Sequence, residues 1–274
     1  MGGVLIFGNG FVAGKFKHAL DNAIISTADI TDRQAVTAEI QKIKPDVVIN
    51  CAGKTGKPNV DWCEDHKAET FNSNTIGPLI LAHACSQLNT YMVHIGSGCI
   101  YTGDNKGKGF TEEDAPNFFG SFYSRTKIWS EQALTAFPVL QLRLRMPVDN
   151  IPGPRNLITK IIRYPKIISI PNSVSILDDF INAAKKLIEK KRTGIYNVTN
   201  PGAITNAEIL DLYKEIIDAK HKYEIISIDE LGKMTKAERS NCVLNTRKLE
   251  SEGIKLPPIK EAIKKTLLKY KEHK

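Results

Sequence analysis

The sequence predicts an α/β protein in which a doubly wound parallel sheet is joined to a smaller C-terminal substrate-binding domain. Three observations predict this fold class: strand-like and helix-like segments alternate through the first half of the 274 residues, a glycine-rich turn follows the first strand-like segment, and the composition changes after Met146. Strands separated by helices form parallel pairs, because a parallel pair needs a long crossover connection.

The first half alternates in a regular order. Apolar runs bounded by turn residues predict strands at residues 3–8, 23–27, 45–53, 91–98 and 138–146. Helical spacing of apolar residues predicts helices between them, at residues 11–20, 33–44, 66–88 and 121–137.

The segment "PVDNIPGPRN" that follows Met146 is rich in proline and asparagine, which is typical of a connection. We therefore expect a dinucleotide-binding domain over residues 1–147 and a substrate-binding domain over residues 148–274. The helix and strand signals of residues 177–198 are expected to return to the sheet of the first domain.

Composition narrows the possible partners. The net charge is +8, but no basic stripe alternates with aromatic residues, so we expect no nucleic-acid partner and a surface that favours phosphate-bearing ligands. No run is apolar enough to span a bilayer and the N-terminus lacks a basic leader, which predicts a cytoplasmic protein without a membrane partner. A homodimer is compatible with the sequence.

The five cysteines form no CxxC pair, so a disulfide framework is not expected. Cys63 and His66 have a ligand-like spacing, but no second pair accompanies them. We therefore interpret this segment as the start of a helix and expect no metal site.

A glycine-rich turn predicts the cofactor site. Gly8, Gly10 and Ala13 have the G-x-G-x-x-A spacing directly after a strand and before a helix. This spacing allows a tight turn, a close approach of backbone to pyrophosphate, and close helix–strand packing. A free helix N-terminus then favours the anion. The alternative, a plain glycine turn, is less consistent with this position in the chain.

Cofactor preference depends on the second strand. Asp29 follows it and could contact a ribose or the adenine. The segment "AIIST" carries no carboxylate, and Lys15 and Lys17 lie near enough in sequence to offer charge to a 2′-phosphate. We therefore predict NADPH, with NADH as the alternative. The same site is expected to include neighbouring residues, namely Phe11, Val12, Ile30, Ala52 and Gly53.

A tyrosine and a lysine predict the chemistry. Tyr123 and Lys127 lie four apart on one helix face, where an ammonium would lower the pKa of the phenol. Tyr270 and Lys274 repeat this spacing in what we expect to be a solvated tail. Only Tyr123 belongs to the alternating half, in which Ser97 ends a strand and could meet the same carbonyl oxygen.

Ser97 and Cys99 lie two residues apart in "HIGSGCIY". On an extended segment they would point to the same side. They could be two core residues or two catalytic groups, and the residue types alone leave both alternatives open.

The glycine turn with Ser97, Tyr123 and Lys127 resembles the extended short-chain dehydrogenase/reductases. Longer segments, among them "KPNVDWCE", "PNFFGSFYSRTK", "RLRMP" and "IPNSVSILDD", resemble the bifunctional UDP-4-keto-6-deoxyglucose 3,5-epimerase/4-reductases that make UDP-rhamnose. The resemblance covers nearly the whole chain. This chain departs from the family in having one residue fewer between its first glycines, and in having Asn9 where an arginine often helps to hold the 2′-phosphate.

The resemblance implies epimerisation at C3 and C5 of a UDP-4-keto-6-deoxyglucose substrate, followed by NADPH-dependent reduction at C4. It also implies that Cys99 and Lys160 supply the base and acid of epimerisation, and that Asn156 and Arg239 lie near the diphosphate or uridine. Residues 54–62 are expected to line the pocket. The alternatives are a UDP- or dTDP-4-keto-rhamnose reductase without epimerase activity, and a non-catalytic nucleotide-binding regulatory subunit.

Overall fold

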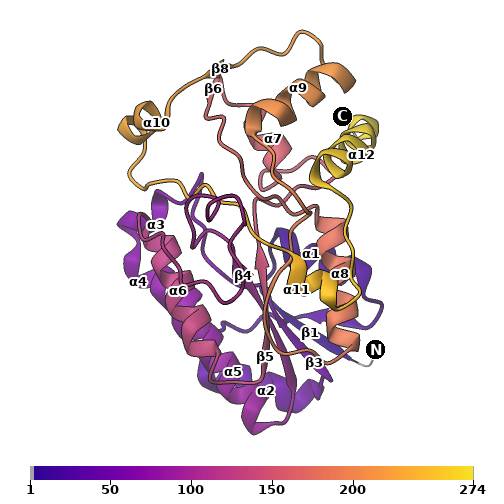
Figure 1. The fold of residues 1–274 in the computed structure, drawn as a ribbon. Coiled ribbons are helices and arrows are strands. Elements are labelled where there is room, and N and C mark those ends of the chain that lie inside the picture. Colours follow the sequence, from indigo (N-terminus) through magenta and orange to yellow (C-terminus); the bar gives the residue numbers. More distant parts are fainter. Residues whose placement is uncertain (1–2, 274) are drawn as a thin grey trace.

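The computed structural model describes residues 3–273 and contains a six-stranded, wholly parallel sheet (Figure 1). The strand order is β2-β1-β3-β4-β5-β7, which confirms the predicted doubly wound fold class. The strands are β1 (Val4–Phe7), β2 (Ala23–Ile25), β3 (Val47–Asn50), β4 (Tyr91–Ser97), β5 (Val139–Leu144) and β7 (Gly194–Asn197).

Helices cover both faces of this sheet, so its central strands are apolar on both sides. Val4 and Ile6 face the core beneath α1 and α8, whereas Leu5 and Phe7 face the core beneath α2 and α5. All four side chains are buried. The helices of these layers are α1 (Phe11–Ala19), α2 (Arg33–Ile43), α5 (Gly77–Gln87), α6 (Phe122–Leu134) and α8 (Leu177–Glu189).

The segment predicted as one long helix is interrupted by a π turn. After α3 (Trp62–Asp65) the chain forms α4 (Lys67–Phe71), then the π turn η1 (Asn72–Ile76), and then α5. The π turn packs against α6. Its Asn74 amide donates to Thr126 Oγ1 at 3.2 Å, which joins the turn to the middle of that helix.

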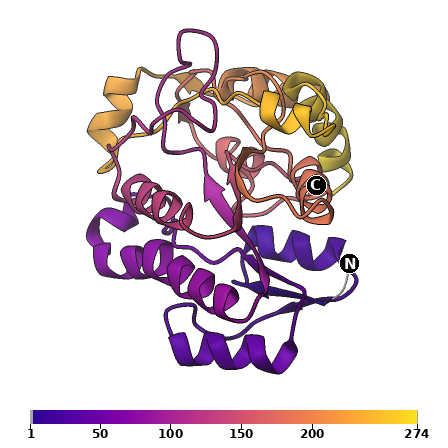
Figure 2. The same cartoon turned by 60° about the horizontal axis from the view of Figure 1, so that its bottom comes forward.

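The chain beyond β5 contributes to two regions (Figures 1 and 2). Helix α8 packs on α1, and β7 pairs with β5 at the edge of the sheet. The remaining elements surround a second apolar core, with α7, α9 and α12 at its centre. These elements are α7 (Leu157–Ile161), β6 (Lys166–Ile167), α9 (Asn206–Ile216), β8 (Glu224–Ile225) and α12 (Ile259–Glu272). Helix α10 (Ile228–Met234) has no buried residue, and α11 (Arg247–Ser251) contacts β7 and places Leu249 in the core beneath α1 and α8. The domain boundaries proposed above stay a prediction.

The C-terminal tyrosine differs from the expectation of a solvated tail. Tyr270 lies on the inner face of α12, is 1% exposed, and its hydroxyl is 2.7 Å from Thr159 Oγ1. The amphipathic spacing of α12 turns this residue into the second core, because Ile263 and Leu267 share its face. Lys274 lies outside the described residues. Within residues 3–273, no helix is both long and apolar enough to cross a membrane.

Candidate active site

The predicted glycine turn lies at the point where the strand order reverses. Strand β1 has β2 on one side and β3 on the other, and ligands of such sheets bind beyond the carboxyl ends of the strands at this point. Gly8 has φ +96°, and a Cβ there would lie 2.6 Å from the backbone nitrogen of Ala52. Only glycine therefore fits between the two strand ends.

The N-terminus of α1 is open to a ligand. Gly10 is its N-cap, no side chain caps the helix, and a Cβ added at Gly10 would meet nothing within 4 Å. The first amides of a helix have no intrahelical acceptor, and they attract anions. Phe11 and Val12 begin the helix and are half-buried. These residues fit the pyrophosphate of a dinucleotide.

The loop that follows β3 lies beside Lys127. A Cβ at Gly53 would lie 3.3 Å from Asn74 Oδ1 and 3.9 Å from Lys127 Nζ. Asn74 holds this loop by accepting from the Lys54 amide at 2.7 Å and donating to the Lys54 carbonyl at 2.9 Å. The π turn thus positions the backbone beside Lys127, a contribution that helical spacing alone did not reveal.

Asp29 and Ile30, which are predicted to contact the cofactor, differ in exposure. Asp29 is exposed, and bonds from the Thr31 amide and hydroxyl lower the pKa of its carboxyl. The Ile30 side chain is buried in the core rather than facing a ligand. The Ile30 side chain is therefore not available to a ligand.

The two lysines invoked for a 2′-phosphate are engaged elsewhere. Lys15 Nζ lies 2.6 Å from Asp149 and 3.2 Å from Asp178, and Lys17 donates to the carbonyl of Ala23. The charge of Lys15 is therefore neutralised within the protein, and the argument for NADPH from this lysine is wrong. Lys17 is exposed, and the bond that it donates is to a neutral carbonyl. The contacts of Lys15 could not have been placed by sequence spacing, because its partners lie more than a hundred residues away.

Ser97 and Tyr123 converge as expected. Ser97 ends β4, and Tyr123 lies in the first turn of α6, which Ser121 caps by accepting from Ser124 N at 3.1 Å. A side-chain hydrogen bond joins Ser97 to Tyr123. The phenol and the serine hydroxyl therefore face one small region beyond the end of β4.

The ionisation of the Tyr123 phenol is opposite to the expectation. Burial raises its pKa and the neighbouring Cys99 thiol adds to the rise, whereas the Ser97 hydrogen bond and the Arg145 guanidinium lower it. Lys127 instead donates to the Ile95 carbonyl at 3.2 Å, and burial lowers the pKa of its ammonium to about 8. The phenol is thus kept protonated and suits the role of a proton donor.

Cys99 is placed by a turn rather than by strand alternation. Strand β4 ends at Ser97, whose Oγ accepts from the Cys99 amide at 3.1 Å, and Ser124 donates to the Cys99 carbonyl at 2.6 Å. The extended geometry assumed from sequence is therefore wrong. The half-buried thiol nevertheless lies close enough to Tyr123 to raise the pKa of its phenol.

Arg145 is a site residue that sequence reasoning missed. It follows β5 directly and donates from Nη1 to Cys99 Sγ at 2.7 Å. The signal was present in the sequence: "RLRM" places two arginines at the end of an otherwise apolar strand, where a charged side chain needs a buried partner.

The residues expected at the substrate end behave differently from one another. Lys160 lies half-buried on α7, where burial and the neighbouring Arg155 lower the pKa of its ammonium. Asn156 is fully buried and its side chain caps α7, accepting from Ile158 N at 3.1 Å and donating to two carbonyls. Both amide hydrogens of Asn156 are therefore taken by carbonyls of the protein, and its assignment to the substrate stays a prediction.

Arg239 is held by a carboxylate. Its guanidinium contacts both oxygens of Asp61, at 2.9 and 3.1 Å, and these bonds outweigh burial and keep the pKa of Asp61 low. Asp61 belongs to the loop of residues 54–62, so Arg239 does lie against the predicted pocket loop. Its role toward a substrate stays a prediction.

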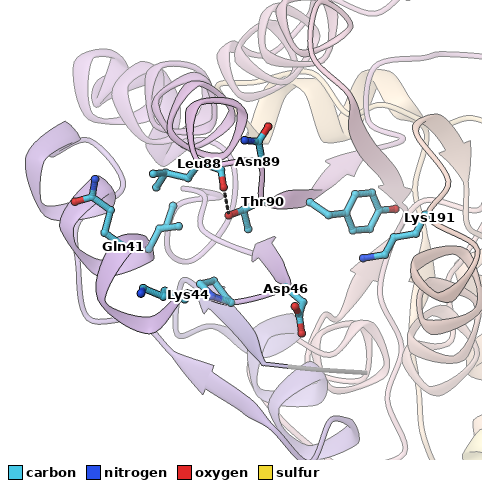
Figure 3. A pocket seen from close by; sticks show the side chains of 10 residues that line it. Gln41, Lys44, Asp46, Leu88, Asn89, Thr90 and Lys191 are labelled. Atoms are coloured by element: carbon cyan, nitrogen blue, oxygen red, sulfur yellow. Dashed lines mark hydrogen bonds between the residues drawn. The ribbon is translucent and has the colours of Figure 1, made fainter.

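A cavity of about 590 Å³ lies away from this site (Figure 3). It is lined by Lys44 and Asp46 before β3 and by Thr90 before β4, so it occupies the amino ends of the strands. Parallel α/β sheets carry their chemistry at the opposite edge. Within the described residues, no cluster of His, Cys, Asp or Glu could hold a metal ion, and Cys63 and His66 lie in and just after the short helix α3.

The parallel sheet, the glycine turn and the Ser97, Tyr123 and Lys127 set define a short-chain dehydrogenase/reductase. A family model described as the RmlD substrate binding domain matches residues 4–148, and the chain belongs to this family.

The relatives narrow this assignment. A bifunctional dTDP-4-dehydrorhamnose 3,5-epimerase/dTDP-4-dehydrorhamnose reductase of Arabidopsis thaliana is 43% identical over 85% of this chain and 80% of that protein. A trifunctional UDP-glucose 4,6-dehydratase/UDP-4-keto-6-deoxy-D-glucose 3,5-epimerase/UDP-4-keto-L-rhamnose-reductase of the same plant is 43% identical over 88% of this chain, which spans only 37% of that longer protein. The predicted resemblance to bifunctional epimerase/reductases is confirmed, and the chain is an enzyme.

Solved structures agree. The UDP-rhamnose synthase L780 of Acanthamoeba polyphaga mimivirus has a TM-score of 0.94 and 37% identity, over 98% of this chain and 99% of that one. A dTDP-4-dehydrorhamnose reductase of Bacillus anthracis in complex with NADP has a TM-score of 0.84 over 97% of this chain and 98% of that one. At 20% identity the latter shows the shared fold.

Proposed function

We propose that this enzyme converts UDP-4-keto-6-deoxyglucose into UDP-L-rhamnose by 3,5-epimerisation followed by NADPH-dependent reduction of the C4 ketone. The observation that carries the proposal is the grouping of the Ser97 and Tyr123 hydroxyls with the Cys99 thiol beyond the end of β4. The similarity to a bifunctional epimerase/reductase and to a UDP-rhamnose synthase supports it.

Epimerisation needs a base, an acid and a site for the negative charge that develops on O4. The C4 carbonyl acidifies the protons on C3 and C5. When a base removes one of them, the C–H electron pair forms an enolate whose charge rests on O4. Hydroxyl donors aimed at O4 stabilise this charge in a water-poor site. We assign the donors to Ser97 and Tyr123, and the base and acid to Cys99 and Lys160.

Reduction reuses the same oxygen site. NADPH supplies the hydride that C4 accepts, and the carbonyl electron pair then moves to O4. Tyr123 gives its phenolic proton to O4, and burial, which raises the pKa of the phenol, keeps that proton in place until the charge on O4 develops. Lys127 lies beside Gly53 and is charged below a pH of about 8, so it orients the cofactor-side groups and stabilises the phenolate that is left.

The residues that would hold the cofactor are those of the switch point. We assign Gly8, Gly10, Phe11 and Val12 to the pyrophosphate, and Ala52 and Gly53 with Lys127 to the nicotinamide side. Asp29 and the backbone of Ile30 are assigned to the adenosine. The fold shared with an NADP complex supports this arrangement.

A reductase without epimerase activity is the second candidate, because the relatives of this fold include reductases. The thiol of Cys99, placed beside the proposed proton donor, favours the bifunctional reaction. A UDP-sugar is the partner that the proposal requires. A cytoplasmic location, a homodimer, and the expected lack of a nucleic-acid or membrane partner stay predictions.

The test is to incubate the purified protein with UDP-4-keto-6-deoxyglucose and NADPH, and in parallel with NADH, and to identify the deoxysugar product by NMR. UDP-L-rhamnose supports the proposal. NADPH consumption with UDP-4-keto-L-rhamnose but no UDP-L-rhamnose from UDP-4-keto-6-deoxyglucose would favour the simple reductase. No NADPH consumption with either sugar would favour the non-catalytic regulatory subunit.

A further inference from the structure

Arg145 is a buried cation whose charge lacks a carboxylate. It is 3% exposed, and within residues 3–273 no acidic side chain forms an ion pair with it. Arg143, two residues earlier, is equally buried but is neutralised by both carboxylate oxygens of Glu131, at 2.8 Å each. A buried charge without a counter-charge is strongly destabilising. The difference between the two arginines therefore needs an explanation.

The other contacts of Arg145 are neutral. Nη2 donates to the amide oxygen of Asn172 and to the Ser240 carbonyl, and Nε has no partner. Nη1 donates to Cys99 Sγ at 2.7 Å. Cys99 is thus the only ionisable side chain to which the described structure gives a hydrogen bond from this guanidinium.

The other acidic groups around the Cys99 thiol stay neutral and so do not balance the charge of Arg145. Tyr123 lies on α6, and burial raises the pKa of its phenol. Burial also raises the pKa of the Cys242 thiol, whose Sγ donates to the Gly98 carbonyl at 3.2 Å. Lys127, on the same helix as Tyr123, adds a second positive charge near Cys99. Tyr123 and Cys242 therefore stay protonated, and the positive charges of Arg145 and Lys127 both favour a negatively charged Cys99 sulfur.

We propose that Arg145 is a positioning residue for epimerisation, holding the Cys99 sulfur as a thiolate aimed at the substrate. The proposal rests on the function proposed above. The thiolate takes a proton from C3 or C5 and becomes a thiol, and the C–H electron pair moves into the enolate with its charge on O4. The Lys160 ammonium then gives a proton to the opposite face of that carbon as the electron pair returns from O4, which inverts the carbon, and exchange with solvent restores the thiolate and the ammonium. Asn172 and Ser240 fix the guanidinium, so that the sulfur has one orientation.

The test measures the reactivity of Cys99 without any substrate. The protein is alkylated with iodoacetamide at a series of pH values, and modification at Cys99 is followed by mass spectrometry. We expect the pH midpoint of modification to lie below that of a free thiol, because the guanidinium 2.7 Å from the sulfur favours the thiolate. In Arg145→Gln the midpoint should rise by about one unit or more, and Arg145→Lys should lie between them because it keeps the charge.

Arg125→Gln is the matched control. Arg125 lies exposed on α6 and donates to the Phe119 carbonyl, so its loss should leave the Cys99 midpoint unchanged. An ordinary thiol midpoint in the wild-type protein would overturn the proposal, even if Arg145→Gln fails to fold. An unchanged midpoint in a folded Arg145→Gln variant would overturn it as well.

The proposed function is tested separately by solvent exchange. In heavy water with the 4-keto sugar and no NADPH, the wild-type protein should exchange the C3 and C5 protons, and Arg145→Gln should exchange them at least about tenfold more slowly. Arg145→Lys should restore part of this rate. A low wild-type alkylation midpoint without wild-type exchange would refute the proposed function and leave the thiolate pair intact.

Discussion

Replacing Tyr123 with phenylalanine removes one oxygen atom from a buried ring and leaves the ring in place. The phenol is 9% exposed and hydrogen-bonds Ser97, so the variant leaves a buried serine with one partner fewer. Such a loss costs about 1–3 kcal/mol of folding free energy, against a total stability of about 5–15 kcal/mol for a typical domain. Ser97 also keeps its bond from the Cys99 amide. We therefore expect Tyr123→Phe to fold.

The same substitution removes the proposed proton donor of the reductase step. General acid catalysis contributes about a hundred- to ten-thousandfold, which corresponds to about 3–5 kcal/mol of activation free energy. The loss should be in kcat, because the glycine turn that binds pyrophosphate is untouched. The assay is NADPH consumption with UDP-4-keto-L-rhamnose, combined with a titration of NADPH binding by fluorescence.

The control is a tyrosine outside the site. Tyr270 is unsuitable, because its buried hydroxyl bonds Thr159 in the second core. Tyr164 is 44% exposed, and Tyr164→Phe should keep both kcat and stability. A Tyr123→Phe variant that binds NADPH and reduces the ketone at nearly the wild-type rate would refute the assignment of Tyr123 as the proton donor.

Three further predictions follow from the site. Cys99→Ala and Lys160→Ala should each slow deuterium exchange at C3, C5 or both while still reducing UDP-4-keto-L-rhamnose. Exchange at the wild-type rate in both variants would show that Cys99 is only a core residue. The rate of reduction should fall as the pH rises through about 8, because Lys127 then loses its proton, and a pH profile that is flat across this region would contradict its role. Gly8→Ala should abolish NADPH binding measured by calorimetry, because its Cβ would lie 2.6 Å from the Ala52 nitrogen at a φ of +96°; unaltered affinity would show that the turn is not the pyrophosphate site.

The fold was predictable from the sequence because its signals are local. Buried strands, helical spacing and the glycine turn each depend on residues that are neighbours in the chain. The convergence of Ser97 and Tyr123 was predictable as well, since both lie at the carboxyl edge of one parallel sheet. These features follow from topology once the strands have been located.

Side-chain partners that are distant in sequence were not predictable. Lys15 was expected to face a phosphate, but Asp149 and Asp178 fold against it and take its charge. The partnership of Arg145 with Cys99 joins two strand ends, and the spacing within either segment carries no information about the other. Asn156 likewise serves the start of its own helix, a local role that the resemblance to a family did not indicate.

The π turn at Asn72–Ile76 has a consequence for how this chain tolerates changes of length. One extra residue in a helical turn rotates all that follows by about 100° relative to a regular helix. A single deletion within the turn would therefore either swing the buried face of α5, including Leu81 and Cys85, out of the core or withdraw Asn74 from the loop that it holds. The number of residues in this helical segment therefore has to suit both the packing of α5 on the sheet and the loop that Asn74 holds.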